Sequence, residues 1–121
     1  MYQTMQRPFA NHVDLTLLER DEEGFLLDAS LWDESLIEPL ADEAGIELTD
    51  EHLQIITYIR DYFETNYRVP EARTLLKHLK SEWGMEKATR RYLYKLFPHG
   101  YGQQACKIAG MRKPRKLMLD V

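Results

Sequence analysis

The sequence predicts an α+β fold that is mostly α, in which a small amino-terminal β-hairpin packs on a bundle of about five helices. Apolar residues recur at the helical period over most of the chain, and the periodic segments are separated by capping residues, glycines and prolines. The alternation typical of a strand is confined to one stretch near the amino terminus. At 121 residues the chain is expected to be one domain, residues 1–121, with a single core.

The hairpin is predicted from the first quarter of the chain. Residues 13–17 alternate between apolar and polar side chains, and residues 21–24 have the composition of a turn, which Gly24 favours. Residues 25–27 then return as a short partner strand. A hairpin this small is not stable alone, so we expect it to dock on the helices. Residues 1–12 show no periodicity and are expected to form a loose terminus.

The helices are predicted from their apolar stripes and from the residues that start and stop them. Gly45 is a stop signal for the first, and Thr49 with the acids after it is a start signal for the second. Pro39 falls inside the first and is expected to kink or split it. The carboxy-terminal residues 111–121 contain Pro114 and a cationic cluster, and are expected to form a flexible arm. The predicted helices span residues 31–44, 50–66, 71–83, 86–96 and 103–109.

The net charge of −4 conceals a strong asymmetry between the two halves of the chain. Residues 1–66 carry sixteen Asp and Glu against three Arg, whereas residues 67–121 carry four acids against thirteen Lys and Arg. The two halves can simply attract each other within one fold. Alternatively, the basic half faces an acidic partner, either nucleic acid or an acidic protein.

The composition excludes several classes of protein. A single cysteine cannot form an internal disulfide, which excludes a disulfide-stapled secreted scaffold. We find no secretory signal segment and no apolar run long enough to cross a membrane, so a cytoplasmic location is expected. The four histidines are scattered, with His52 expected at the surface, and they suggest no metal site. No catalytic triad, paired-cysteine motif or phosphate-binding loop is visible, so neither a self-contained active site nor a cofactor is expected.

The sulfur of Cys106 is the atom on which any chemistry would depend. Nearby positive charge lowers the pKa of a thiol and so increases the reactive thiolate, and Lys107 is adjacent. In the alternative interpretation, Cys106 is a small buried hydrophobe that packs beside Ala105 and Ile108. Helical spacing does not distinguish the two.

The predicted helices 71–83 and 86–96 have the spacing of a helix-turn-helix, with a third helix before them. Arg90, Arg91 and Lys95 on the last of these could neutralise the phosphates of a nucleic acid. They could equally well pair with the acidic amino-terminal half. Two helices joined across a glycine are common in small α-rich proteins, so the pattern is a weak signal.

One segment carries a family resemblance. Residues 91–100 (Arg-Tyr-Leu-Tyr-Lys-Leu-Phe-Pro-His-Gly), residues 104–110 (Gln-Ala-Cys-Lys-Ile-Ala-Gly) and Lys113-Pro114 resemble the DsrC/TusE family of sulfur-relay proteins. Upstream, the turn at residues 21–26, the Ser30-x-Trp32 pair and the helix from Leu53 to Phe63 fit the same family. The resemblance covers residues 14–114. It implies a small hairpin on a helical bundle with a helix-turn-helix-like part and a mobile carboxy-terminal arm.

The resemblance also implies a function, from which this chain departs at one position. Members of the family are sulfur carriers, whose principal cysteine is penultimate and stands eleven residues beyond the position of Cys106. That position is Leu117 in this chain, and the last five residues contain no thiol. Cys106 matches the inner cysteine of the family, so an intramolecular disulfide is impossible. A persulfide on Cys106 or a disulfide with a partner's thiol would still be possible.

Two functions therefore compete. In the first, the protein carries or passes persulfide sulfur through Cys106, in tRNA thiolation or sulfur metabolism, to other sulfur-relay proteins or a sulfite-reductase-like enzyme. In the second, a divergent member without carrier activity is a regulatory protein- or DNA-binding module. The residues expected to bind a partner or nucleic acid are Arg90, Arg91, Lys95, Lys107, Arg112, Lys113, Arg115 and Lys116.

Overall fold

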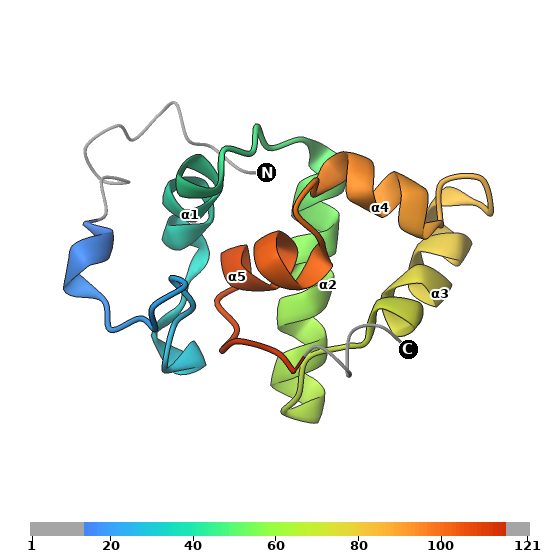
Figure 1. Cartoon of the computed structure of the whole chain (residues 1–121). Helices are drawn as coiled ribbons and strands as arrows, with labels where there is room; N and C mark the ends of the chain where they lie inside the picture. The colour runs from blue at the N-terminus through green and yellow to red at the C-terminus, as the bar shows by residue number, and fades with distance from the viewer. Residues whose placement is uncertain (1–13, 116–121) are drawn as a thin grey trace.

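The computed structural model describes residues 14–115, and within that range the chain is mostly helical (Figure 1). The predictions for residues 1–12 and for residues 116–121 of the arm lie outside the described residues. The α-helices are α1 (Ile37–Ala44), α2 (Asp50–Asn66), α3 (Ala72–Trp83), α4 (Arg90–Leu96) and α5 (Cys106–Ile108). Short 3-10 turns lie at Leu15–Leu17, Ala29–Leu31 and Glu34–Leu36, and a π-helical turn at Tyr101–Ala105 runs directly into α5.

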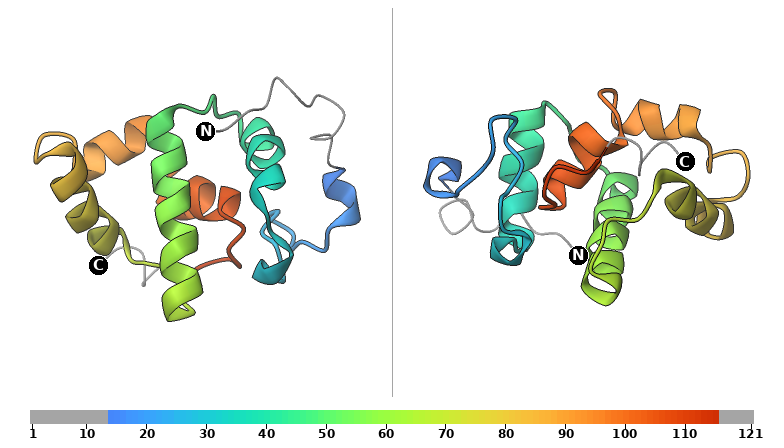
Figure 2. Two further views of the ribbon diagram at one scale, coloured as in Figure 1. Left: turned by 180° about the vertical axis from the view of Figure 1, so that it is seen from behind. Right: turned by 60° about the horizontal axis from the view of Figure 1, so that its bottom comes forward.

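Helix α2 is the centre of the bundle. The π-helical turn and α5 lie across one face of α2, with α1 on one side of them and α3 and α4 on the other (Figures 1 and 2). Ile55, Ile56 and Ile59 on α2 are fully buried, and the core extends from them to the apolar faces of the other helices. Burial of this apolar stripe is the main stabilising contribution of the helix.

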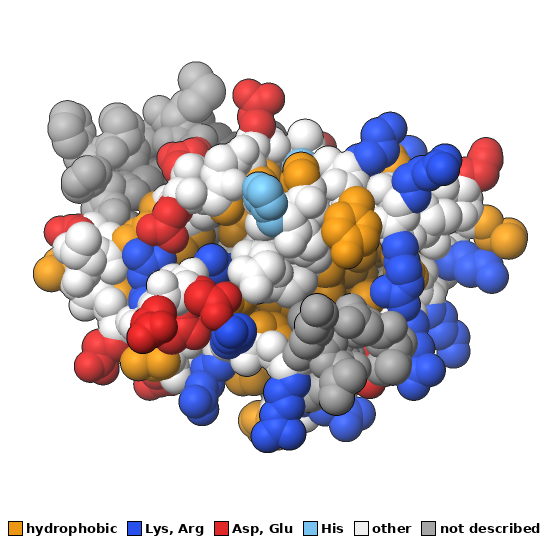
Figure 3. Space-filling model, viewed as in Figure 1, with side chains coloured by type: hydrophobic (Ala, Val, Ile, Leu, Met, Phe, Trp, Pro, Cys, Tyr) orange, Lys and Arg blue, Asp and Glu red, His pale blue; other side chains and the backbone are white. Residues whose placement is uncertain are grey.

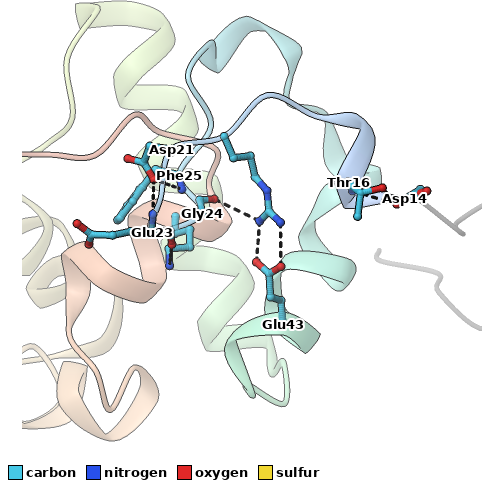
Figure 4. Close-up of polar contacts among 9 residues, drawn as sticks. Asp14, Thr16, Asp21, Glu23, Gly24, Phe25 and Glu43 are labelled. Carbon is cyan, nitrogen blue, oxygen red and sulfur yellow. Dashed lines mark hydrogen bonds and ion pairs between the residues drawn. The ribbon is translucent and has the colours of Figure 1, made fainter.

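The predicted hairpin does not form as a pair of strands. Leu15–Leu17 is a 3-10 turn, and among residues 14–115 the only β-pairing is one antiparallel bridge between Arg20 and Leu26. The turn itself is confirmed, because the Gly24 N–H donates to the Asp21 carbonyl at 3.0 Å. The Asp21 carboxylate also accepts from backbone N–H groups in this turn, as Figure 4 shows. The Asp21 carboxylate therefore fastens the turn that was predicted. Backbone bonds from the Asp21 N–H to the Phe25 carbonyl (2.8 Å) and from the Leu27 N–H to the Glu19 carbonyl (3.2 Å) pair residues 25–27 with residues 19–21, and not with residues 14–17, which were predicted as strand.

Two of the predicted helices keep their bounds and two begin later than predicted. Helices α2 and α3 lie within one residue of their predicted bounds. Helix α1 begins only at Ile37, so Pro39 falls in its first turn, where its missing N–H needs no partner and the helix is neither kinked nor split. Helix α4 begins four residues later than predicted because Thr89 caps it, with Oγ1 accepting from the Tyr92 N–H at 3.1 Å.

His52 is buried, contrary to the prediction that it lies at the surface. Its side chain is 6 % exposed and joins the start of α2 to the end of α4. Nε2 donates to the Leu96 carbonyl at 2.7 Å, and Nδ1 accepts from the Thr49 N–H at 3.1 Å. Both ring nitrogens are thus satisfied within the fold, which makes His52 a structural residue.

Three residues fix the chain where it leaves α5, and we call them the arm-base clasp: Trp32, Arg60 and Gly110. The Trp32 indole donates to the Ile108 carbonyl at 2.8 Å. The Arg60 guanidinium lies 4.5 Å from the Trp32 ring centroid and donates to the carbonyls of Ala29 (3.2 Å) and Ala109 (3.1 Å). Segments that are distant in sequence are therefore tied together at one point.

The backbone of Gly110 passes so close to Trp32 that there is no room for a side chain. A Cβ atom at this position would lie 2.5 Å from Cγ and 2.7 Å from Cβ of Trp32, and closer still to Cδ1. Gly110 also has a φ of +77°, which side-chain-bearing residues rarely adopt.

We expect Gly110→Ala to destabilise the protein by about 3 kcal/mol or more, since the strained backbone and the ring clash add. Gly45→Ala is the matched control, because Gly45 has a similar φ of +74° but no atom within 4 Å of the added Cβ. It should lose only about 1 kcal/mol. Urea unfolding of both variants measures the difference, and equal losses would show that the Trp32 ring does not resist the substitution.

Candidate functional site

Cys106 begins α5 and lies inside the bundle. It is 0 % exposed, as are Ala105 before it and Ile108 after it. The π-helical turn leads directly into α5, and residues from Gln104 to Met111 are buried apart from Lys107, which is partly exposed. Of the two interpretations left open by the sequence, the structure favours the small buried hydrophobe.

Burial also changes the chemistry of the thiol. It raises the pKa of Cys106 to about 12, because a thiolate would be cut off from water. A hydrogen-bonding interaction with Tyr101 lowers that pKa by a smaller amount. Tyr101 is itself buried, with its hydroxyl donating to the Pro70 carbonyl at 2.7 Å, and burial raises its pKa well above the usual range. The neighbourhood therefore favours the neutral, unreactive form of the sulfur.

Lys107 and Lys113, both predicted to bind a partner, are bound within the fold. The ammonium group of Lys107 donates to the Glu23 carbonyl at 2.6 Å and lies 4.9 Å from the Phe25 ring centroid. Lys113 forms an ion pair with the Glu23 carboxylate, and this hydrogen bond lowers the pKa of Glu23. Here the two oppositely charged halves attract each other, so these two cations are not free for an acidic partner.

The turn at residues 21–24 is held from its other side by Arg20. Its guanidinium donates to both carboxylate oxygens of Glu43 on α1, at 2.7 and 3.0 Å, and to the Gly24 carbonyl at 3.3 Å (Figure 4). Its hydrogen bond lowers the pKa of Glu43. The 21–24 turn is therefore held in place from one side by Arg20 and from the other by Lys107 and Lys113.

The cations of α4 have a different environment. Arg90, Arg91 and Lys95 are exposed, and the described residues offer them no acidic partner; Lys95 lies 5.9 Å from the Tyr92 ring centroid. Figure 3 shows Lys and Arg gathered over α3 and α4, and Asp and Glu mostly on the opposite side. The six residues between α3 and α4 exceed the three to four typical of a helix-turn-helix, which stays a prediction.

Arg112 and Arg115, the remaining described cations of this set, are exposed on the chain that follows the arm-base clasp. They line a groove together with residues of α2 and of the 27–32 segment, and not with Cys106 or α4. Lys116 lies outside the described residues. The structure thus separates the predicted site residues into a sealed thiol, two lysines bound to the 21–24 turn, the α4 cations and the two groove arginines.

Sequence reasoning missed the residues that the structure places at the arm base, Trp32 and Arg60. Arg60 is 7 % exposed, an unusual position for an arginine within an otherwise apolar stripe, and its Nε has no hydrogen-bond partner among the described residues. The sequence signal that could have revealed Arg60 is its position as a single cation on the apolar face of the predicted helix 50–66.

Two further features were sought in residues 14–115. Within that range no three His, Cys, Asp or Glu side chains are grouped so as to hold a metal ion. No helix there is both long and apolar enough to cross a lipid bilayer.

Comparison with known proteins identifies the family. A family model described as "DsrC like protein" matches residues 12–118. The protein "Sulfurtransferase TusE" of Pectobacterium atrosepticum is 42 % identical over 96 residues, which are 79 % of this chain and 88 % of that protein. The protein of the same name from Escherichia coli (strain K12) is 41 % identical over 99 residues, or 82 % of this chain and 91 % of that one.

Solved structures agree. The oxidised gamma-subunit of the dissimilatory sulfite reductase (DsrC) from Archaeoglobus fulgidus superimposes with a TM-score of 0.74 at 46 % identity, over 81 % of this chain and 90 % of that one. DsrC of Allochromatium vinosum gives 0.71 at 39 % identity, over 81 % and 88 % of the two chains. The chain therefore belongs to the DsrC-like family of sulfur-relay proteins.

Proposed function

We propose that this protein takes part in sulfur relay by binding a partner, and that its own thiol does not carry sulfur while the bundle is closed. The observation that carries this proposal is the burial of Cys106, the only cysteine in the sequence, at 0 % exposure. A carrier must accept the outer sulfur of a donor persulfide on its thiolate and release the donor as a thiol. This step requires a thiolate that the donor can reach, and the buried thiol of Cys106 is neither ionised nor accessible.

The ionisation alone is a large barrier. A thiol with an ordinary pKa of about 8.5 is about one-tenth thiolate at pH 7.5. With the pKa of Cys106 raised to about 12, the ionised fraction at that pH is smaller by orders of magnitude. Exclusion of the donor from the core would slow the reaction further, so the predicted transfer through Cys106 needs an opened bundle.

The relatives indicate the class of partner. The Archaeoglobus fulgidus protein is named as a subunit of dissimilatory sulfite reductase, and the curated relatives are named sulfurtransferases. By this likeness the partner is another sulfur-relay protein or a sulfite-reductase-like enzyme, in tRNA thiolation or in sulfur metabolism. Exposed arginines suit such a contact because their planar groups pair with carboxylates.

A nucleic acid is the second candidate partner. The observation that favours it is the set of exposed cations on α4, which the described residues leave without an acidic partner. Salt-sensitive retention on duplex DNA that is lost in Arg90→Gln/Arg91→Gln would support this function. Retention of the double variant at the wild-type salt concentration would exclude α4 as the contact.

The sulfur-transfer step is tested by mass spectrometry after incubation with a low-molecular-weight persulfide. We expect the native protein to gain no adduct of about 32 Da, and the denaturant-unfolded protein to gain one, because unfolding exposes the thiol. Cys106→Ser should gain none in either state. An adduct on the native protein at the rate of the unfolded chain would overturn the proposal and restore Cys106 as a carrier.

The raised pKa also predicts how stability depends on pH. The unfolded chain releases the Cys106 proton near its ordinary pKa, whereas the folded protein holds it until about pH 12. The free energy of unfolding should therefore fall as pH rises above about 9, by about 1.4 kcal/mol per pH unit from this group.

Urea unfolding at a series of pH values tests this in wild type and in Cys106→Ala. Lysines and tyrosines titrate in both proteins, so the difference between the two isolates the thiol. The stability advantage of the wild type should shrink with rising pH. A difference independent of pH would mean that the thiol is not sealed in the folded state.

A further inference from the structure

A groove lies where three segments meet at the lower edge of the molecule as drawn in Figure 1, and we call it the arm-base groove. Its walls are the 27–32 segment, the carboxy-terminal end of α2 with the residues after it, and residues 112–115. Its volume is about 810 Å³, within the range of ordinary ligand sites. The three segments are far apart in the chain and line the same groove, and Figure 2 shows their backbones from two further directions.

The floor of the groove is apolar and firmly held. Trp32 and Phe63 line it, with Arg60 stacked 4.5 Å from the first ring centroid and 5.6 Å from the second. Arg60 is fixed in turn by two backbone carbonyls and by Glu64, at 3.2 Å. Leu27 is 48 % exposed at the margin. An apolar side chain placed on this floor would be removed from water without rearrangement of the groove.

Tyr67 stands at the rim and is unusual in two ways. It is the only residue besides glycine with a positive φ among residues 14–115, at +58°, where it ends α2. Glycine or asparagine normally occupies such a position, since a side chain is strained there. The tyrosine ring is also 83 % exposed, so burial in the core does not explain why it is present. Strained residues of this kind cluster at binding sites.

The charge around the groove is positive. Arg68, Arg112 and Arg115 line it, are exposed, and form no ion pair within the described residues. The two acids of the lining are already engaged: Glu64 binds Arg60, and Asp28 accepts from the backbone and hydroxyl of Ser30. The unbalanced charge is therefore cationic, and guanidinium groups pair with carboxylates in a two-pronged geometry.

We propose that the arm-base groove binds an acidic segment of a partner protein, with an apolar or aromatic side chain on the Trp32 and Phe63 floor, the Tyr67 ring against it, and carboxylates on the three arginines. The open shape suits a peptide segment more than an enclosed small molecule, and the apolar floor distinguishes it from a simple phosphate site. This deepens the proposed function, and rests on it only for the identity of the partner.

The test measures the affinity of a fluorescent acidic peptide of about ten residues, rich in Asp and Glu with two Phe, by anisotropy. Tyr67→Asn should weaken binding about tenfold while stability stays equal or rises, because asparagine tolerates the left-handed backbone. A merely structural tyrosine would instead lose stability and leave affinity unchanged. Arg112→Gln/Arg115→Gln should weaken binding at least tenfold and reduce its salt dependence.

Matched controls separate this groove from general charge attraction. Arg91→Gln/Lys95→Gln on α4 also removes two exposed cations and should change the affinity less than twofold. A peptide with Ser in place of Phe should bind at least tenfold more weakly, since it leaves the floor empty. The proposal would be overturned if the α4 variant lost as much peptide affinity as the Arg112/Arg115 variant, or if single-stranded DNA of the same charge bound more tightly than the peptide.

The chain itself offers two other occupants. If a variant ending at Arg115 bound the peptide more than tenfold tighter than the full chain, residues 116–121 would be the natural occupant. If sedimentation showed that the protein self-associates and that the peptide reverses this, the acidic half of a second copy would be the natural occupant of the groove. Either result would overturn the assignment to a partner. The persulfide measurement on Cys106 is independent of all these variants, so failure of the groove and failure of the proposed function are distinguishable.

Discussion

The structure depends on the contact of Trp32 and Arg60 with the backbone that leaves α5. The indole binds the Ile108 carbonyl and the guanidinium binds the Ala109 carbonyl, at 2.8 and 3.1 Å. Carbonyls at the end of a helix have no partner within it, so side chains from elsewhere must supply one. Because those side chains come from segments far away in sequence, this contact closes the fold. Only glycine at position 110 allows it, since any Cβ there would overlap the Trp32 ring.

The charge asymmetry of the sequence has two physical outcomes in one molecule. Around the 21–24 turn it is used internally, where Lys113 pairs with the Glu23 carboxylate and Lys107 donates to the Glu23 carbonyl. The Arg20–Glu43 pair lies within the acidic half and holds the same turn. Such exposed pairs each contribute little to stability, but together they fix the orientation of the turn against α5. The α4 cations and three arginines of the arm-base groove, Arg68, Arg112 and Arg115, have no acidic partner among the described residues, so these positive charges are available to bind a partner.

The sequence predicts those parts of the fold whose signals are local. Helix α2 follows from the Thr49 cap and a long apolar stripe, and α1 ends at Gly45 as predicted. The hairpin is formed only in part: residues 25–27 return as predicted but bond to residues 19–21, because the alternation at residues 14–17 does not by itself make a strand. The late start of α4 is encoded locally by Thr89, a good capping residue.

The candidate site was less predictable because its determinants are not local. Helical spacing around Cys106 is the same whether the thiol faces the core or water, and only the packing of α1 and α2 against α5 decides. The groove is assembled from three segments, so no single motif encodes it. Tyr67 is not visible in the sequence either. It follows Asn66, the last residue of α2, where glycine is usual, but the sequence alone does not reveal its positive φ.

Sulfur transfer and partner binding place opposite demands on the same few residues. Exposing Cys106 requires α5 to leave α2, which breaks the Trp32 and Arg60 hydrogen bonds and uncovers Ile108 and Met111, both fully buried. With about 1 kcal/mol for each hydrogen bond and about 2 kcal/mol for each apolar side chain, opening costs on the order of 6 kcal/mol. Trp32 and Arg60 also form the groove floor, so a ligand bound there stabilises the closed state. Occupation of the groove therefore works against exposure of the thiol, and a partner that docks there would meet a protein whose sulfur is even less accessible than before.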